Sequence, residues 1–152
     1  MSDHRATVSW RNDGGDFPRR RYSRAHTWRF DGGVVVPASA SPDIVAAPYA
    51  RADAVDPEEA FVASIAACHM LWALALAAAR KLDVAAYDDD AVGVMAKDAD
   101  GREWIARVTL RPRMVFNGPP PDAASLAALH HEAHARCFIA NSVKTEIVVE
   151  PG

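Results

Sequence analysis

Several features are absent or scarce in this sequence, and each absence narrows the possible functions. Only two of the 152 residues are cysteines, so the chain lacks the cysteine density of a small disulfide scaffold. It contains no glycine-rich phosphate loop, no Gly-x-Ser-x-Gly nucleophile elbow and no paired zinc motif. The net charge is only −3, which gives no reason to expect a nucleic acid or an anionic membrane as a partner.

The N-terminal region also lacks the apolar core of a signal peptide, because charged residues recur from Asp3 to Arg29. We therefore expect a cytoplasmic protein. In a reducing compartment, two cysteines are more often a redox or catalytic pair, or two inert core thiols, than a structural disulfide. The length predicts one domain, residues 1–152, with a substantial core.

Residues 56–81 contain the one long apolar run. The stretch begins with an acidic cap, a proline at the first helical position and two glutamates, and it ends with two basic residues, which is the charge order that a helix dipole favours. A helix without a polar face is buried on all sides. The pattern predicts a central helix that other elements surround, with Cys68 in its middle.

An apolar run of this length could also cross a bilayer. This run is mostly alanine, has His69 in its middle and is the only one of its kind in a mixed sequence. These features favour a core helix and no membrane partner.

The rest of the chain predicts short strands, one irregular loop and a second helix. Pro37 is expected to end the third strand, Asp88–Asp90 to form a solvated turn, and Pro112 to make the far end of a long strand an edge or a bend. The predicted strands are residues 6–10, 22–30, 34–36, 84–87, 91–97, 103–116 and 143–149; the loop is residues 39–53, and the second helix runs from Asp122 to about Arg136.

This order predicts an α+β fold with antiparallel sheets and two main helices. A helix as apolar as residues 56–81 needs more cover than a chain of this length provides. We therefore predict an intimate homodimer in which the partner's sheet helps to bury it.

Cys68 is the leading candidate for chemistry, although a free cysteine often only packs in a core. The second thiol, Cys137, lies at the end of the second helix, where a mobile loop could let the two sulfurs meet. A reactive thiolate needs positive or hydrogen-bonding neighbours, and spacing alone leaves their identity open. The possible suppliers are Arg21, Arg24, Arg51 and His69.

Glu58 is explained as a helix-start residue, and it lies ten residues from Cys68. At about 1.5 Å per residue a straight helix separates the two by about 15 Å. If Glu58 serves a thiol, it must come through a helix break or from a partner subunit.

His130, His134 and Cys137 lie at i, i+4 and i+7 and therefore share one face of the second helix. Two imidazoles and a thiolate could bind a transition metal. A polar helix surface that happens to carry histidines explains the pattern equally simply, and no Cys-x-x-Cys unit accompanies it. We favour the second explanation and predict no metal and no organic cofactor.

Two motifs together resemble the OsmC/Ohr family of thiol peroxidases. The first is the Pro-Glu-Glu of residues 57–59 followed by Ala-Cys-His-Met-Leu at residues 67–71, and the second is a helix that ends in Cys137 before Asn141 and a last strand. Residues 22–26 and 87–95 are similar to an OsmC-like branch of that family. Phe138 differs from the proline that often follows the second cysteine, and Asp56 replaces an asparagine that caps a helix equally well.

The resemblance implies an intertwined α+β homodimer, with antiparallel sheets around two central helices and two active sites at the interface. By analogy Cys68 is the peroxidatic thiol and Cys137 the resolving thiol, and Glu58 holds an arginine over the sulfur. Arg51 and Arg24 are the first choices for that arginine, and Arg21 is the third.

These implications predict a peroxidase that reduces organic hydroperoxides, and hydrogen peroxide less efficiently, through a sulfenic acid and a disulfide that an external dithiol restores. Ile65, Leu71, Trp72 and Phe138 are candidate walls for an organic tail. The alternative is a non-enzymatic dimer that senses redox state, or binds a metal or ligand, with the same thiols.

Overall fold

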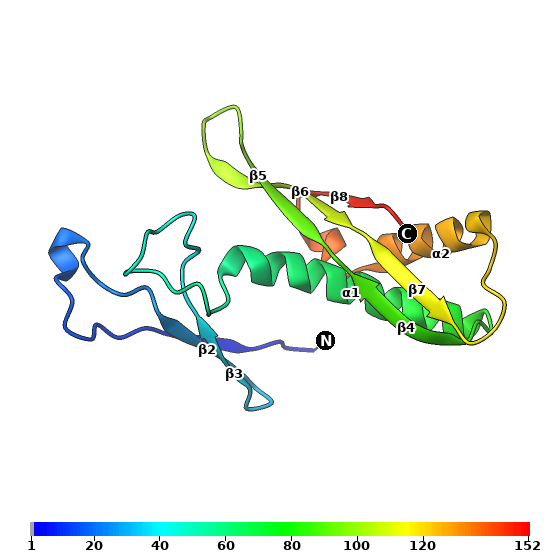
Figure 1. The fold of residues 1–152 in the computed structure, drawn as a ribbon, viewed down its shortest axis with the longest axis horizontal. Coiled ribbons are helices and arrows are strands. Elements are labelled where there is room, and N and C mark those ends of the chain that lie inside the picture. Colours follow the sequence, from blue (N-terminus) through cyan, green and yellow to red (C-terminus); the bar gives the residue numbers. More distant parts are fainter. Residues whose placement is uncertain (1) are drawn as a thin grey trace. The chain divides into compact units, whose positions relative to one another are not determined.

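The computed structural model describes residues 2–152 and divides the chain into two compact units, one ending at Ala60 and the other comprising Phe61–Gly152. The elements are, in chain order, β1 (Ala6–Ser9), the 3-10 helix η1 (Phe17–Arg19), β2 (His26–Phe30), β3 (Val35–Ala38), α1 (Pro57–Ala79), β4 (Val84–Asp89), β5 (Val92–Lys97), β6 (Glu103–Leu110), β7 (Pro112–Phe116), α2 (Ala123–Arg136), η2 (Ala140–Ser142) and β8 (Glu146–Val149). This is the predicted mixed α+β fold, with two helices and mainly antiparallel sheets (Figure 1).

The first unit is built on an antiparallel sheet in the order β1-β2-β3. Val8 pairs with Trp28, and Trp28 pairs with Val36 on the other side. The turn between β2 and β3 contains Gly33 at φ 87°, a left-handed conformation that glycine adopts without strain. The predicted hairpin is therefore confirmed.

Two details of this unit differ from the sequence prediction. The second strand begins at His26 rather than at residue 22, because residues 22–25 form no strand. Pro37 lies inside β3 instead of ending it, where it pairs with Thr27. β3 is an edge strand of this sheet, and an edge strand tolerates a residue without a backbone N–H.

Helix α1 begins with a reciprocal pair of hydrogen bonds. The backbone N–H of Glu59 donates to Asp56 Oδ1 at 2.7 Å, and the backbone N–H of Asp56 donates to Glu59 Oε2 at 3.2 Å. This capping box satisfies two backbone donors at the helix start. Lys81, just after the helix, has a left-handed φ of 61°. The helix Pro57–Ala79 therefore lies within the predicted stretch 56–81, which is confirmed to within two residues at each end.

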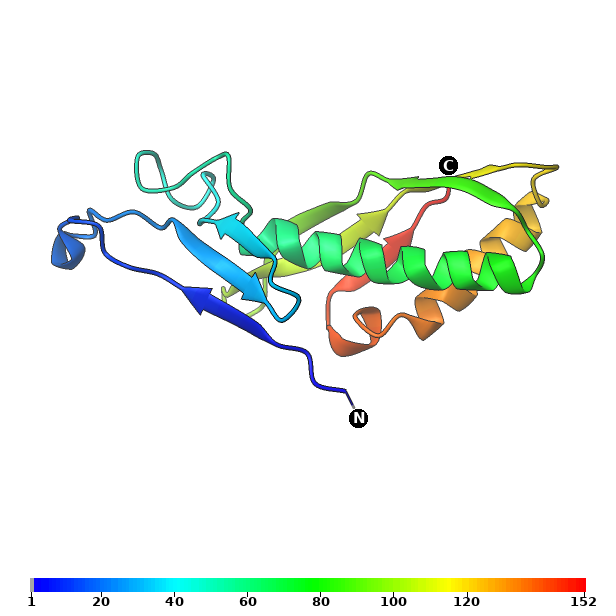
Figure 2. The same ribbon diagram turned by 90° about the horizontal axis from the view of Figure 1, so that it is seen from below.

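The second unit contains two small sheets. β4 pairs with β7, and the other sheet has the order β5-β6-β8. Figure 2 shows α2 beside the C-terminal half of α1. β8 runs parallel to β6, with Ile147 opposite Val108, so the last strand is an exception to the predicted antiparallel pairing.

The predicted strand over residues 103–116 is two strands in different sheets. β6 ends at Leu110 and β7 starts at Pro112, so the bend expected at Pro112 is a change of sheet. The solvated turn expected at Asp88–Asp90 is wrong for its first two residues, which belong to β4. The carboxylate of Asp89 accepts a hydrogen bond from the backbone N–H of Arg111 at 2.6 Å, which ties this strand end to the point where the sheet changes.

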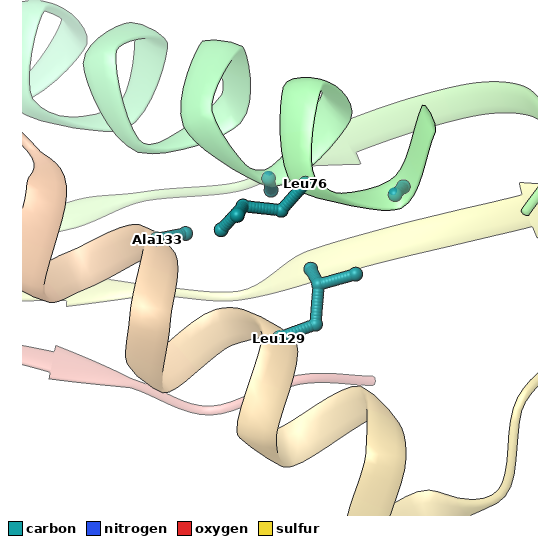
Figure 3. Packing of buried hydrophobic residues seen from close by; sticks show 5 residues of the cluster. Leu76, Leu129 and Ala133 are labelled. Atoms are coloured by element: carbon teal, nitrogen blue, oxygen red, sulfur yellow. The ribbon is translucent and has the colours of Figure 1, made fainter. Parts of the chain in front are cut away.

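The core of the second unit lies where α1 and α2 meet. Leu76 of α1 packs with Leu129 and Ala133 of α2 (Figure 3). A second cluster joins Ile65 of α1 to Val108 and Leu110 of β6. The first cluster packs the C-terminal half of α1 against α2, and the second packs the part of α1 around Ile65 against β6.

Within one chain α1 is not buried on all sides, as expected for a helix that needs more cover than one chain provides. Its buried residues follow a single stripe: Ile65, His69, Ala73, Leu76 and Ala77. Leu71 on another side is 63% exposed. By length and composition α1 is the one helix in residues 2–152 that could cross a membrane, but a core helix of a soluble protein meets the same criteria.

Candidate active site

The two cysteines are brought together in the second unit. Cys68 lies in the middle of α1 and is half-buried, and Cys137 follows the last residue of α2 and is 1% exposed. The backbone N–H of Cys137 donates to the carbonyl of His134 at 3.2 Å, which holds it against the end of the helix. Both are free thiols.

The electrostatics of the two thiols differ. The pKa of Cys137 is raised to about 11, first by burial and next by a hydrogen bond with the Cys68 thiol. The weak bond that Sγ of Cys137 accepts from the backbone N–H of Ala140 at 3.4 Å acts in the opposite direction on this pKa. Cys137 therefore keeps its proton at neutral pH.

This arrangement is suited to two-step thiol chemistry. A small oxidant reaches a half-buried sulfur more readily than a buried one. An oxidised Cys68 then has a second thiol beside it, with which it can condense. The closeness of the two cysteines was the feature that spacing in the sequence could not establish.

Glu58 lies at the start of α1, in the first unit. Its Oε2 atom is buried and has no hydrogen-bond partner among the described residues. α1 is continuous from Pro57 to Ala79, so the helix break that would bring Glu58 to Cys68 within one chain is absent.

The three candidate arginines have different surroundings in the first unit. Arg51 forms a two-pronged ion pair with Asp53, at 2.9 and 2.7 Å, on the surface. Arg24 donates from Nη1 to the backbone carbonyls of Tyr22 and Arg20, at 2.6 and 3.2 Å. Arg21 is exposed and forms an isolated backbone bridge with Asp16.

The histidines at the end of α2 do not form the metal site considered from the sequence. No three His, Cys, Asp or Glu side chains in residues 2–152 are grouped to hold a metal ion. His130 instead lies against His69 of α1, with Nδ1 of His130 3.0 Å from Nε2 of His69. Both rings are buried, at 2% and 1% exposure.

Sequence analysis missed this histidine pair. A signal was present, because His69 interrupts an apolar helix and a buried imidazole needs a polar partner. The partner, 61 residues away, could not be identified from spacing.

Aromatic side chains lie beside the thiols. Trp72 follows Cys68 by one helical turn and shares its face of α1. Phe138, the residue after Cys137, contacts Trp72 edge-on with 5.6 Å between ring centroids and is 69% exposed. These two of the four predicted wall residues are in contact, whereas Ile65 is a core residue and Leu71 is exposed.

Comparisons with known proteins agree with this fold. The model of the OsmC-like protein family matches residues 50–151. An OsmC-like protein of unknown function from Vibrio cholerae is 48% identical, and the match covers 100% of both chains with a TM-score of 0.97. The sequence has no significant match among curated proteins.

More distant solved structures share the fold at low identity. The organic hydroperoxide resistance protein OhrB of Bacillus subtilis is 20% identical over 99% of this chain and 98% of its own, with a TM-score of 0.72. An organic hydroperoxide resistance protein from Elizabethkingia anophelis is 18% identical over 99% and 94%, with a TM-score of 0.73. At these identities the likeness concerns the fold alone.

Proposed function

The chain belongs to the OsmC-like family, and from that premise we propose that it is a cysteine-based peroxidase that reduces organic hydroperoxides. The observation that carries the proposal is the pair of free thiols, one half-buried and one fully buried, that interact in the second unit. The organic hydroperoxide resistance proteins with the same fold support the reaction class.

Cys68 is the peroxidatic residue in this proposal because it is the more accessible thiol. Its thiolate attacks the distal peroxide oxygen, the O–O bond breaks, and the alkoxide leaves and is protonated to an alcohol. Cys68 is then a sulfenic acid. Cys137 loses its proton and attacks the Cys68 sulfur, which releases water and forms a disulfide. An external dithiol reduces the disulfide by thiol exchange and is itself oxidised.

A homodimer completes the proposed site. Glu58 and an arginine, Arg24 or Arg51, come from the partner subunit, because α1 has no break that could bring Glu58 to Cys68 in one chain. The unpartnered buried oxygen of Glu58 is an acceptor that a guanidinium can satisfy. The arginine then favours the thiolate and polarises the peroxide. No metal or organic cofactor takes part, and the proposed location is the cytoplasm.

The test is stopped-flow oxidation of the reduced protein by cumene hydroperoxide and by hydrogen peroxide, with Cys68→Ser and Cys137→Ser as matched variants. We expect fast oxidation of the wild type, faster with the organic peroxide, and no fast phase in Cys68→Ser. In Cys137→Ser a sulfenic acid should accumulate, which dimedone labelling and mass spectrometry detect.

A wild type that reacts no faster than a free thiol overturns the proposal. The same thiols would then belong to a redox-sensing or ligand-binding dimer. A fast phase that survives in Cys68→Ser and disappears in Cys137→Ser would instead reverse the two roles.

A further inference from the structure

The turn that follows α2, residues 137–142, carries Cys137 and is closed by its own hydrogen bonds. The backbone N–H of Asn141 donates to the carbonyl of Cys137 at 3.0 Å. The hydroxyl of Ser142 donates to the carbonyl of Phe138 at 2.7 Å. The turn includes no proline that would fix a φ angle, so these bonds contribute directly to its conformation.

One side chain ties this turn back to α2. Nδ2 of Asn141 donates to the carbonyl of Ala135 at 3.1 Å. Ala135 is next to last in α2, and the carbonyls of the last helical turn have no N–H partner within the helix. Among the described residues, this is the only side-chain hydrogen bond between the turn and α2. Cys137 therefore lies inside a loop whose two ends, Ala135 and Asn141, are joined.

Burial holds only one side of the turn. Cys137 is 1% exposed, and Ile139 packs against the second core cluster. The side chains of Phe138, Asn141 and Ser142 are exposed to solvent. The hydrogen bond from Asn141 to α2 is therefore what restrains the exposed side of the turn.

The position of Cys137 matters because a sulfenic acid at Cys68 has two possible fates. The Cys137 thiolate can attack the Cys68 sulfur, which forms the disulfide and releases hydroxide that is protonated to water. A second hydroperoxide can instead transfer one oxygen atom to Cys68, which becomes a sulfinic acid while the hydroperoxide becomes an alcohol. Only the first fate depends on how often the Cys137 sulfur lies within bonding reach of Cys68.

We propose that Asn141 is a positioning residue, whose bond to Ala135 keeps Cys137 within reach of Cys68 and so favours the disulfide over the sulfinic acid. This role in the catalytic cycle rests on the proposed function. An amide suits the position because it donates a hydrogen bond without carrying a charge. Asn141→Asp has nearly the same shape, but its carboxylate offers the carbonyl no donor, so it removes the bond and keeps the bulk.

The test is the partition of oxidised Cys68 between disulfide and sulfinic acid. Mass spectrometry measures it after titration of the reduced protein with cumene hydroperoxide in the absence of a reductant. In Asn141→Ala and Asn141→Asp, half conversion to sulfinic acid should need about fivefold less peroxide than in the wild type, which is the usual weight of one hydrogen bond. The rate of the first oxidation of Cys68, measured by stopped flow, should stay unchanged. A variant that loses its fold would alter that first step as well.

Equilibration with reduced and oxidised dithiothreitol gives a second readout that needs no peroxide. The ratio of reduced to oxidised reagent that half-reduces the Cys68–Cys137 disulfide should be about fivefold lower in the two Asn141 variants. The matched control is Asn117→Ala. It removes an exposed amide that donates to Asp83 at 3.0 Å, outside the turn, and it should equal the wild type in both measurements.

The proposal is wrong if the Asn141 variants have the wild-type dithiothreitol ratio, or if they partition between disulfide and sulfinic acid as the wild type does. A wild type that forms no Cys68–Cys137 disulfide would also overturn it. A wild type that reacts slowly with peroxide, but whose variants show the expected shift with dithiothreitol, would refute the peroxidase and support the role of Asn141 in holding Cys137.

Discussion

The imidazoles of His69 and His130 form a buried stacked pair between α1 and α2. Nε2 of His69 lies 3.0 Å from Nδ1 of His130, and the ring planes differ by 10°. One nitrogen donates and the other accepts, so at least one of the two rings must be neutral at this contact. The outer nitrogens, Nδ1 of His69 and Nε2 of His130, are buried without a partner in the described residues.

The first prediction is that this pair makes the fold sensitive to acid. The pKa of His69 is lowered from 6.5 to about 4, first by burial and then by the nearby His130 and His134, and burial also lowers the pKa of His130. Between pH 6.5 and 4, His69 is therefore mostly protonated in the unfolded chain and mostly neutral in the folded protein. The free energy of unfolding therefore does not depend on the protonation of His69 above pH 6.5. It falls by on the order of 3 kcal/mol as the pH is lowered toward 4.

Urea unfolding at pH 7 and at pH 4 measures this loss. His69→Gln should lose less stability than the wild type over the same interval, because it has no imidazole to protonate. The control is His131→Gln, since His131 is exposed, and its pH dependence should equal that of the wild type. An NMR titration in which His69 protonates near pH 6.5 would contradict the prediction.

The second prediction concerns the pH dependence of disulfide formation. Because the pKa of Cys137 is raised to about 11, few molecules carry its thiolate at neutral pH, and the resolving attack needs that thiolate. The rate of disulfide formation after a peroxide pulse should rise about tenfold per pH unit between pH 7 and 9. Stopped-flow tryptophan fluorescence follows this phase, which Cys137→Ser should lack. A plateau below pH 9 would show that Cys137 gives up its proton more easily once Cys68 is oxidised.

The third prediction tests how closely β5 packs on α1. A Cβ atom at Gly93 would lie 2.6 Å from Cγ2 of Val62. This distance is too short for a van der Waals contact, so β5 or the Val62 side chain would have to move. Gly93→Ala should therefore destabilise the fold by about 1–3 kcal/mol in urea unfolding. Val62→Ala should recover part of this loss when combined with it. Gly32→Ala is the control, because a Cβ atom added at Gly32 would meet no described atom within 4 Å, and it should change stability little.

Local signals in the sequence were sufficient for the main elements of the fold. Asp56 and Asp122 identified both helix starts because a side-chain cap acts within three residues, and both make the expected bond to a backbone N–H. The parallel pairing of β8 with β6 was beyond such signals, because it depends on contacts between distant segments. The split at Arg111 was only partly visible, since Pro112 indicates a bend but not a change of sheet.

The candidate site divides in the same way. The family motifs identified Cys68 and Cys137, and the structure places the two cysteines near each other. The pairing of His69 with His130 was missed because the two residues become neighbours only when α1 packs against α2. The roles of Glu58, Arg24 and Arg51 stay predictions, since they require a second subunit.

The last prediction tests that second subunit. The exposed side of α1 carries Leu71 at 63% exposure, and an apolar helix face of this kind marks an interaction surface. Other large apolar side chains exposed in the second unit are Val92, Val94, Met95, Val115 and Phe138. If a second copy covers this surface, sedimentation should give about twice the 16.4 kDa of one chain.

Leu71→Glu should shift the protein toward monomer, because a buried unpaired carboxylate at the interface costs several kcal/mol. Leu71→Met conserves volume and polarity and should remain a dimer. The monomeric variant should keep the helical circular dichroism signal of the wild type, since Leu71 lies outside the two core clusters. It should also lose fast peroxide reduction if Glu58 and the arginine come from the partner. A wild type that sediments as a monomer and still reduces cumene hydroperoxide rapidly would mean that the thiol pair reacts without either group.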